Sequence, residues 1–174
     1  VGYAKEVVER GGVLLIPAFS VGRSQEIACV LKSHKFPYTV AMDGMALKTN
    51  EIFMRHQEDL ANPKLFRDAI AGVEIMTNWN QRRRIVETPS VIIAPAGMLS
   101  GGSSVFYNKM VTSKTKNGVA LVSFQAPGTP GRTLMEKKVV IVNGKPRKIK
   151  SEVRKFDFSS HSGKKELFEM FSKI

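Results

Sequence analysis

Apolar residues follow two patterns along the chain, namely short continuous runs and stripes at helical spacing. The runs at 13–17 (VLLIP), 90–95 (SVIIAP) and 119–124 (VALVSF) have the length of strands that are buried on both faces of a sheet. Two shorter segments, 38–43 and 73–76, are predicted to be strands as well. Stripes at helical spacing predict helices at 4–10, 20–34, 45–60, 62–72, 104–118 and 164–174.

This alternation of strands and helices favours an α/β fold with a mainly parallel sheet flanked by helices. The last third of the chain differs, because 138–150 has two β-rich arms joined by Asn143-Gly144, a strong hairpin signal. A length of 174 residues is enough for one domain with a real core, and no repeat or low-complexity linker divides it. We therefore expect one α/β domain with an appended basic β-hairpin.

Charge narrows the possible partners. The chain has 27 Lys and Arg residues against 15 Asp and Glu residues, a formal net charge of +12. Segment 137–155 alone holds eight basic residues and one acidic residue, and Arg82, Arg83 and Arg84 add a second basic run. Such a surface favours polyanions, most directly nucleic acid. Charge alone does not separate RNA, DNA and membrane lipid, and a merely solubilising surface stays open.

Composition excludes several classes of protein. The single cysteine, Cys29, rules out a disulfide framework or a cysteine-based zinc site, and its place on an apolar stripe favours a small buried side chain. The apolar run VLLIPAF is far shorter than the roughly 18 residues of a membrane span, and the N-terminal residues lack the apolar core of a secretory signal. We expect a cytoplasmic protein with no membrane partner.

Three loops with small residues follow predicted strands: PAFSVGRSQE, PAGMLSGGSS and QAPGTPGR. In a parallel sheet, ligands bind where strands end and helices begin, and helix N-termini offer free N–H groups to phosphate. The stretch GMLSGGSS has nearly the spacing of a P-loop, but Ser103 stands where the phosphate-binding lysine belongs. A nucleotide site is therefore disfavoured.

The three histidines have different surroundings. His34 and His56 lie on helical stretches and are predicted to be surface residues. His161 lies between small residues in FDFSSHSGKKELF, where an apolar strand gives way to a helix. It has no second histidine or acidic residue at ligand spacing. From the residues alone, His161 is either structural or has its partners outside this chain.

Five segments, in this order, resemble the motifs of the β-CASP family of nucleases, a branch of the metallo-β-lactamase fold. They are GGVLLIPAFSVGRSQEIACVL, DGMALKTNEIF, APAGMLSGGSSVFY, SFQAPGTPGRTL and FDFSSHSG, which together cover about residues 10–165. The last segment is similar to F-S-A-H-A-D, the family's motif B. The resemblance implies a Rossmann-like β-CASP domain at 1–160, with 161–174 holding motif B and the return into a metallo-β-lactamase domain.

The resemblance also assigns residues. It implies that His161 lies at the cleft between the two domains, touches the scissile phosphate and acts as a general acid, which an imidazole suits. Ser159 and Ser160 flank it. Phosphate contacts are expected from Gly101, Gly102, Ser103, Arg132 and Arg23, the last of which serves equally well as a structural bridge. An RNA-binding patch is expected at Lys145, Arg147, Lys148 and Lys150.

The family's two zinc ions are bound by the lactamase domain through H-x-H-x-D-H and further ligands, none of which is in this sequence. We therefore assign no metal ligand here, and we expect this fragment to bind no zinc and to be inactive alone. Expected partners are RNA, the protein's own lactamase domain, and a second copy or other processing subunits.

The chain departs from the family pattern at three places. Ala94-Pro95-Ala96 replaces a serine pair, Gly163 stands where motif B has an aspartate, and Thr129-Pro130 precedes Gly131. The leading expectation is a zinc-dependent ribonuclease of RNA processing, 3′-end maturation or decay. A catalytically silent RNA-binding or scaffold subunit of a 3′-end processing complex and a DNA-repair nuclease stay open, as does the choice between endo- and exonuclease action.

Overall fold

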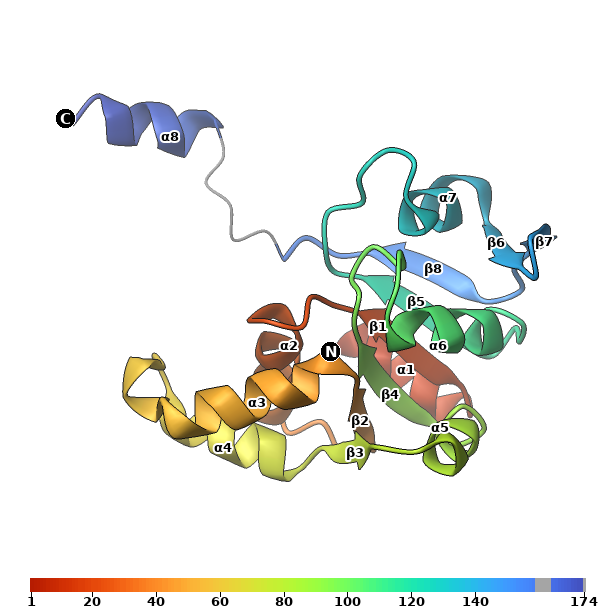
Figure 1. The fold of residues 1–174 in the computed structure, drawn as a ribbon, viewed down its shortest axis with the longest axis horizontal. Helices are drawn as coiled ribbons and strands as arrows, with labels where there is room; N and C mark the ends of the chain where they lie inside the picture. Colours follow the sequence, from red (N-terminus) through yellow and green to blue (C-terminus); the bar gives the residue numbers. More distant parts are fainter. Residues whose placement is uncertain (159–163, 174) are drawn as a thin grey trace.

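The computed structural model describes residues 1–158 and 164–173. Its described strands form a six-stranded sheet in the order β3-β2-β4-β1-β5-β8, and every pair of neighbours is parallel. The strands of this sheet are β1 Val13–Pro17, β2 Val40–Asp43, β3 Glu74–Met76, β4 Ser90–Ala94, β5 Gly118–Leu121 and β8 Glu152–Lys155. The predicted α/β architecture is confirmed (Figure 1).

Helices cover both faces of the sheet. The helices are α1 Gly2–Glu9, α2 Arg23–Ser33, α3 Met45–Arg55, α4 Pro63–Ala71, α5 Trp79–Ile85, α6 Ser103–Val111, α7 Pro130–Lys137 and α8 Lys164–Phe171, with a 3-10 turn η1 at Gln57–Asp59. None of the helices in the described ranges is long and apolar enough to cross a membrane. Helix α8 follows residues 159–163 and is drawn apart from the sheet in Figure 1.

The core has two halves because successive side chains of a strand point to opposite faces. In β1, Leu14 and Ile16 pack with residues of α1, α2 and α4, whereas Val13 and Leu15 pack with residues of α5, α6 and α7. All five residues of β1 and of β4 are buried. This burial explains why the central strands read as continuous apolar runs.

Two helices, α5 and α7, were missed by the sequence prediction, and the strand expected before His161, which is β8, was given no bounds. Residues 79–85 were interpreted only as a basic run, although Asn78 and Gln81 form a capping box that starts α5. Thr129 caps α7, with Pro130 at its first position. Residues 152–155 were assigned to the basic segment but form the edge strand beside β5. The charged residues of β8 obscured the apolar pattern of a strand. Glu152 pairs with Arg10, just after α1, and Arg154 pairs with Glu6 of α1.

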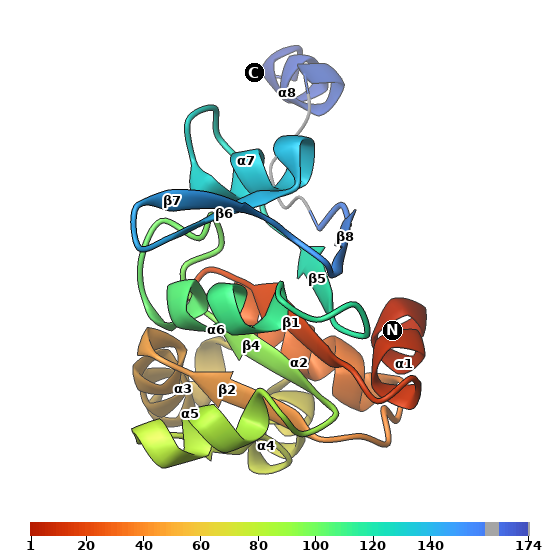
Figure 2. The same cartoon turned by 90° about the vertical axis from the view of Figure 1, so that its right-hand side faces the viewer.

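The predicted hairpin is confirmed as β6 Val139–Val142 and β7 Lys145–Lys148, a separate two-stranded antiparallel sheet. Asn143 and Gly144 both have positive φ, 51° and 73°, as a type I′ turn requires. Figure 2 shows the hairpin between α6 and α7. Its base is fixed where the Ile149 amide donates to Lys138 (3.0 Å) and the Lys150 amide donates to Thr112 (2.9 Å).

Candidate nucleic-acid interface

The loops that carry the quoted motifs meet at one edge of the sheet. Loop 18–22 follows β1, loop 95–102 follows β4, loop 122–129 follows β5, and residues 156–158 follow β8. These four strands are neighbours and parallel, so their carboxyl ends lie side by side. The sequence predicted this convergence for the first three loops, and the structure adds the end of β8.

Gln125 locks two of these loops together. Its buried side-chain amide donates to the carbonyls of Gly97 (3.1 Å) and Ser123 (2.9 Å). The amide of Gly131 donates to Met98 (3.0 Å), and a Cβ added to Gly131 would lie 1.7 Å from Gln125 Oε1. Glycine is therefore required at 131 for this close approach, and the loops after β4 and β5 form one packed unit.

Gly101, Gly102 and Ser103 form the turn that starts α6. The Ser104 hydroxyl donates to Ala96 (2.9 Å) and Gly101 (3.2 Å), which fixes the turn against the end of β4. Gly102 has φ 67°, and a Cβ there would lie 2.6 Å from the Pro95 carbonyl oxygen. The turn thus places the N-terminus of α6 at the sheet edge, where the Ser104 amide already donates to the Pro95 carbonyl (2.7 Å), so a phosphate would have to use the other amides of the turn. Contact with phosphate stays a prediction for these three residues.

A hollow of about 710 Å³ lies beside the ends of β1, β5 and β8. Its lining includes Arg23, Met98, Phe158 and the exposed rings of Phe19 and Phe124, whose exposed fractions are 44% and 61%. Phe158, the first residue of FSSHSG, which resembles motif B, is the last described residue before His161. Ser159, Ser160 and His161 lie outside the described residues, so their predicted roles stay predictions.

Arg23 bridges the start of α2 and the segment that leads to motif B. Its guanidinium pairs with Glu26 and lies 5.6 Å from the centre of the Phe158 ring. Its side chain is only 11% exposed. These contacts agree with the structural role that the sequence left open for Arg23, while the phosphate contact stays a prediction.

Arg132 lies in the first turn of α7, close to the loop that Gln125 fixes. Its Nε donates to Glu136 Oε1 (2.7 Å), and its side chain is 38% exposed. Exposed ion pairs of this kind contribute roughly 0–1 kcal/mol to the stability of the folded protein. A phosphate could therefore replace Glu136 as the partner of Arg132 at little cost.

A buried carboxylate at the end of β2 was missed by the sequence analysis. Asp43 is fully buried, accepts two hydrogen bonds from Arg82 (2.7 and 2.9 Å), and also accepts from Tyr107 (2.7 Å) and the Gly44 amide (2.6 Å). The interpretation of Arg82 as part of a basic surface run was wrong, because Arg82 is the ion-pair partner of Asp43 and lies 5.1 Å from the Trp79 ring.

This cluster shifts two pKa values. Burial, followed by the hydrogen bond to Asp43, raises the pKa of Tyr107 well above its ordinary value. The hydrogen bond to Asp43 also raises the pKa of Arg82. Tyr107 is therefore neutral and Arg82 charged, and the cluster holds α5 and α6 against the sheet edge.

The predicted basic patch lies on the hairpin and is exposed. Lys145, Arg147 and Lys148 are on β7, and Lys150 follows it. Within the described ranges, no carboxylate lies at ion-pair distance from any of these four side chains. Other basic residues are paired, among them Arg10, Arg82, Arg84, Lys114, Arg132 and Arg154, whereas Lys5, Lys32 and Lys64 on the helices also have no carboxylate at ion-pair distance within the described ranges. The hairpin therefore holds positive charge that the domain does not neutralise itself.

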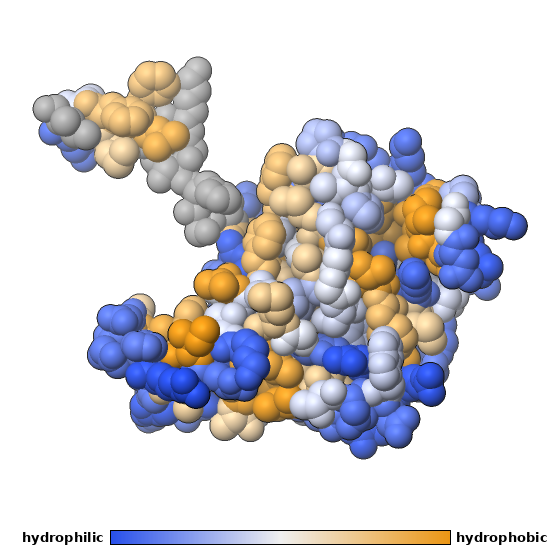
Figure 3. All heavy atoms as spheres, in the orientation of Figure 1, coloured by the Kyte–Doolittle hydropathy of each residue, from blue (hydrophilic) through white to orange (hydrophobic). Residues whose placement is uncertain are grey.

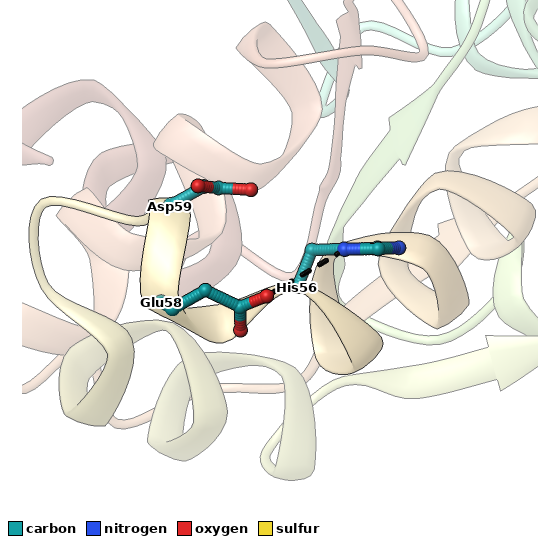
Figure 4. Close-up of side chains that lie close together, drawn as sticks. All are labelled: His56, Glu58 and Asp59. Atoms are coloured by element: carbon teal, nitrogen blue, oxygen red, sulfur yellow. Dashed lines mark ion pairs between the residues drawn. The ribbon is translucent and has the colours of Figure 1, made fainter.

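In the part of the chain that the structure describes, one group of potential metal ligands lies elsewhere. His56, Glu58 and Asp59 are exposed on the turn between α3 and α4, with ligand atoms within 4.8 Å of one another (Figure 4). Glu58 Oε1 lies 3.7 Å from His56 Nδ1. This turn is remote in the fold from the edge that carries the motif loops. These exposed residues lie on a different part of the fold from the motif loops, so they are not assigned to a zinc centre beside motif B.

Fold and interface together define an α/β domain that presents glycine loops, helix N-termini and unpaired basic residues. The profile described as the Beta-Casp domain matches residues 24–134, well over half of the chain. The chain belongs to the Beta-Casp domain family, as the motifs indicated.

Similar proteins come from archaea. The chain is 42% identical to RNase aCSPSF2 of Saccharolobus solfataricus over 97% of this chain and 34% of that protein. It is 31% identical to the probable RNase MJ4 of Methanocaldococcus jannaschii over 98% of this chain and 41% of that protein. It is 33% identical to the transcription termination factor FttA of the same organism over 97% of this chain and 30% of that protein. The chain thus spans about a third of the length of these curated relatives.

Proposed function

We propose that this chain is the nucleic-acid-clamping β-CASP part of a zinc-dependent ribonuclease that acts in RNA processing, in 3′-end maturation or decay. The observation that carries the proposal is the convergence of the motif loops on one sheet edge, next to the segment that enters motif B. The names of two relatives, RNase aCSPSF2 and probable RNase MJ4, support RNA as the substrate.

In this proposal, RNA lies along the carboxyl edge of the sheet. The turn at Gly101–Ser103 and the side chain of Arg132 hold its backbone, and His161 donates a proton to the leaving oxygen. Two zinc ions would be held by a metallo-β-lactamase domain outside this chain, and the chain alone would be inactive. We place the protein in the cytoplasm, in contact with its own lactamase domain and with a second copy or other processing subunits.

Cleavage of labelled single-stranded RNA by the full-length protein tests this proposal. His161→Ala should lower the cleavage rate by about 10²-fold or more, the range for loss of a general acid or base. His34→Ala is the matched control, because His34 is exposed at the end of α2, and it should stay within about twofold of the wild type. Equal rates for wild type and His161→Ala would exclude the assigned role.

A second candidate is a catalytically silent RNA-binding or scaffold subunit. Gly163 in place of the motif B aspartate favours it, as does Ala94, which ends β4 fully buried and without a hydroxyl group. A full-length protein that binds RNA tightly but does not cleave RNA, with or without added zinc, would support this candidate. Cleavage of duplex DNA in preference to RNA would point instead to a DNA-repair nuclease of the same fold.

A further inference from the structure

A groove of about 450 Å³ separates the hairpin from α6 and the start of α7. One wall is β6 with the Asn143-Gly144 turn, and the other is α6 through Lys109. Leu99 and Gly128, from the two loops that Gln125 fixes, also line this hairpin groove. A single concave surface therefore joins the motif loops to the hairpin.

The hairpin places basic residues beside apolar ones. Lys145 pairs with Val142, Arg147 with Val140, and Lys148 with Val139 across the two strands. All of β7 is exposed, and Ile141 of β6 is 50% exposed. Figure 3 shows hydrophobic and hydrophilic atoms side by side over the hairpin at the right-hand edge. Opposite residues of an antiparallel pair share a face, so Lys145 and Arg147 lie on one face of the hairpin and Lys148 on the other, each beside valines of β6. This mixture of unneutralised charge and apolar side chains complements a polyanion that has apolar faces of its own.

We propose that the hairpin groove binds a single-stranded segment of RNA, with bases against β6 and phosphates toward Lys109, which lines the groove, and toward the exposed basic residues of the neighbouring strand β7. The inference rests on the RNA-processing function proposed above and adds a contact area away from motif B. The volume of the groove is within the range of small-ligand sites, roughly 300–1,000 Å³, so it admits bases singly. Double-stranded RNA is read instead by the shape of its wide minor groove, which a narrow groove does not match.

The hairpin groove is preorganised. The base of the hairpin bonds to Thr112 at the end of α6 and to Lys138 at the end of α7. The two helices that flank the groove, α6 and α7, therefore also hold the hairpin in place. RNA binding need not order this part of the chain, which saves the conformational entropy that a flexible loop would lose.

Binding of labelled RNA, followed by fluorescence anisotropy at several salt concentrations, tests the proposal. The charge variant is Lys145→Gln/Arg147→Gln/Lys148→Gln, and its control is Lys5→Gln/Lys32→Gln/Lys64→Gln, three exposed lysines on α1, α2 and α4 with the same total charge change. The apolar variant is Ile141→Ala, and its control is Ile75→Ala on β3, where the isoleucine is 47% exposed.

For an RNA of about 16 nucleotides, the charge variant should bind at least tenfold more weakly at low salt. The slope of log K against log salt should fall by about 2, because each phosphate contact on a single strand contributes about 0.7. The control variants should bind within about twofold of the wild type. Ile141→Ala should weaken the binding of single-stranded RNA at least threefold and leave duplex binding unchanged.

Equal losses in the charge variant and its control would overturn the proposal, and so would equal effects of Ile141→Ala on single- and double-stranded RNA. Competition by polyglutamate as strong as competition by RNA would show a general polyanion surface and would also overturn it. Cleavage assays on the full-length protein keep the two proposals apart. Cleavage of long RNA that is insensitive to the hairpin variants refutes the groove alone, whereas hairpin-dependent binding without any cleavage refutes the ribonuclease alone.

Discussion

Replacing Asp43 with asparagine should destabilise the domain strongly, because this carboxylate is fully buried and holds three partners. It accepts hydrogen bonds from Arg82, Tyr107 and the Gly44 amide. An asparagine at this position would remove the negative charge and place an NH₂ group, which only donates, opposite one of these donors. Arg82 would then be left as an unpaired charge next to the core.

The size of the effect follows from the burial of the two partners. Removing one partner of a buried ion pair costs roughly 3–5 kcal/mol. The Arg82 side chain is 21% exposed, so its guanidinium can regain part of its hydration, and we expect the low end, about 3 kcal/mol. With an m-value of about 2 kcal/mol per molar urea, the unfolding midpoint should fall by about 1.5 M.

Urea denaturation of Asp43→Asn, Arg82→Gln and the double variant checks this reasoning. Because both single changes break the same interaction, the double variant should cost about 2 kcal/mol less than their sum. Arg83→Gln is the matched control, since Arg83 is the exposed neighbour on α5, and it should change stability by less than about 0.5 kcal/mol. A midpoint shift below about 0.3 M, or additive losses, would refute the assigned role of Asp43.

Two further predictions concern the glycine loops and alkaline pH. Gly131→Ala should cost about 2–3 kcal/mol of stability because its Cβ would overlap Gln125 Oε1. Gly101→Ala, with no atom within 4 Å of the added Cβ, should be nearly neutral. Thermal unfolding compares the two variants, and equal stability would contradict the packing argument. Burial, followed by the charge of Glu152, raises the pKa of Tyr3 to about 12. The unfolded value is about 10, so the stabilisation is complete below pH 10 and is lost as the pH rises toward 12. Because phenylalanine cannot ionise, the free energy of unfolding of Tyr3→Phe should fall by about 2 kcal/mol less than that of the wild type between these pH values. Urea midpoints that change in parallel for the two proteins over this range would contradict the raised pKa of Tyr3.

Local pattern was enough to predict most of the fold. The central strands are buried on both faces and read as apolar runs, and Asn143-Gly144 marked the hairpin turn. The bounds of β8 could not be read from local pattern, because its charged residues pair with distant ones. Arg154 pairs with Glu6, 148 residues earlier in the chain, and Glu152 pairs with Arg10, 142 residues earlier. At an edge strand, ion pairs to a distant helix replace the apolar alternation that marks a strand.

The candidate interface was predicted in part. The loops after β1, β4 and β5 were recognised because small residues followed apolar runs, and parallel strands bring such loops together. The Asp43 cluster was missed because Arg82 and Tyr107 lie 39 and 64 residues further along the chain. The tertiary fold alone brings these three residues together, so Arg82 looked like any other residue in a basic run.

The contacts between α1 and β8 have a consequence for biosynthesis. Tyr3, Glu6 and Arg10 at the start of the chain meet Glu152 and Arg154 near its end. During translation, Arg10 gains its partner Glu152 only after a further 142 residues have been made. Helix α1 can pack on β1 and β4 as soon as these strands form, whereas its polar side chains wait for β8. A nascent chain that stalls before β8 would therefore leave the edge of β5 and the charged side chains of α1 without their partners on β8, open to chaperones and proteases.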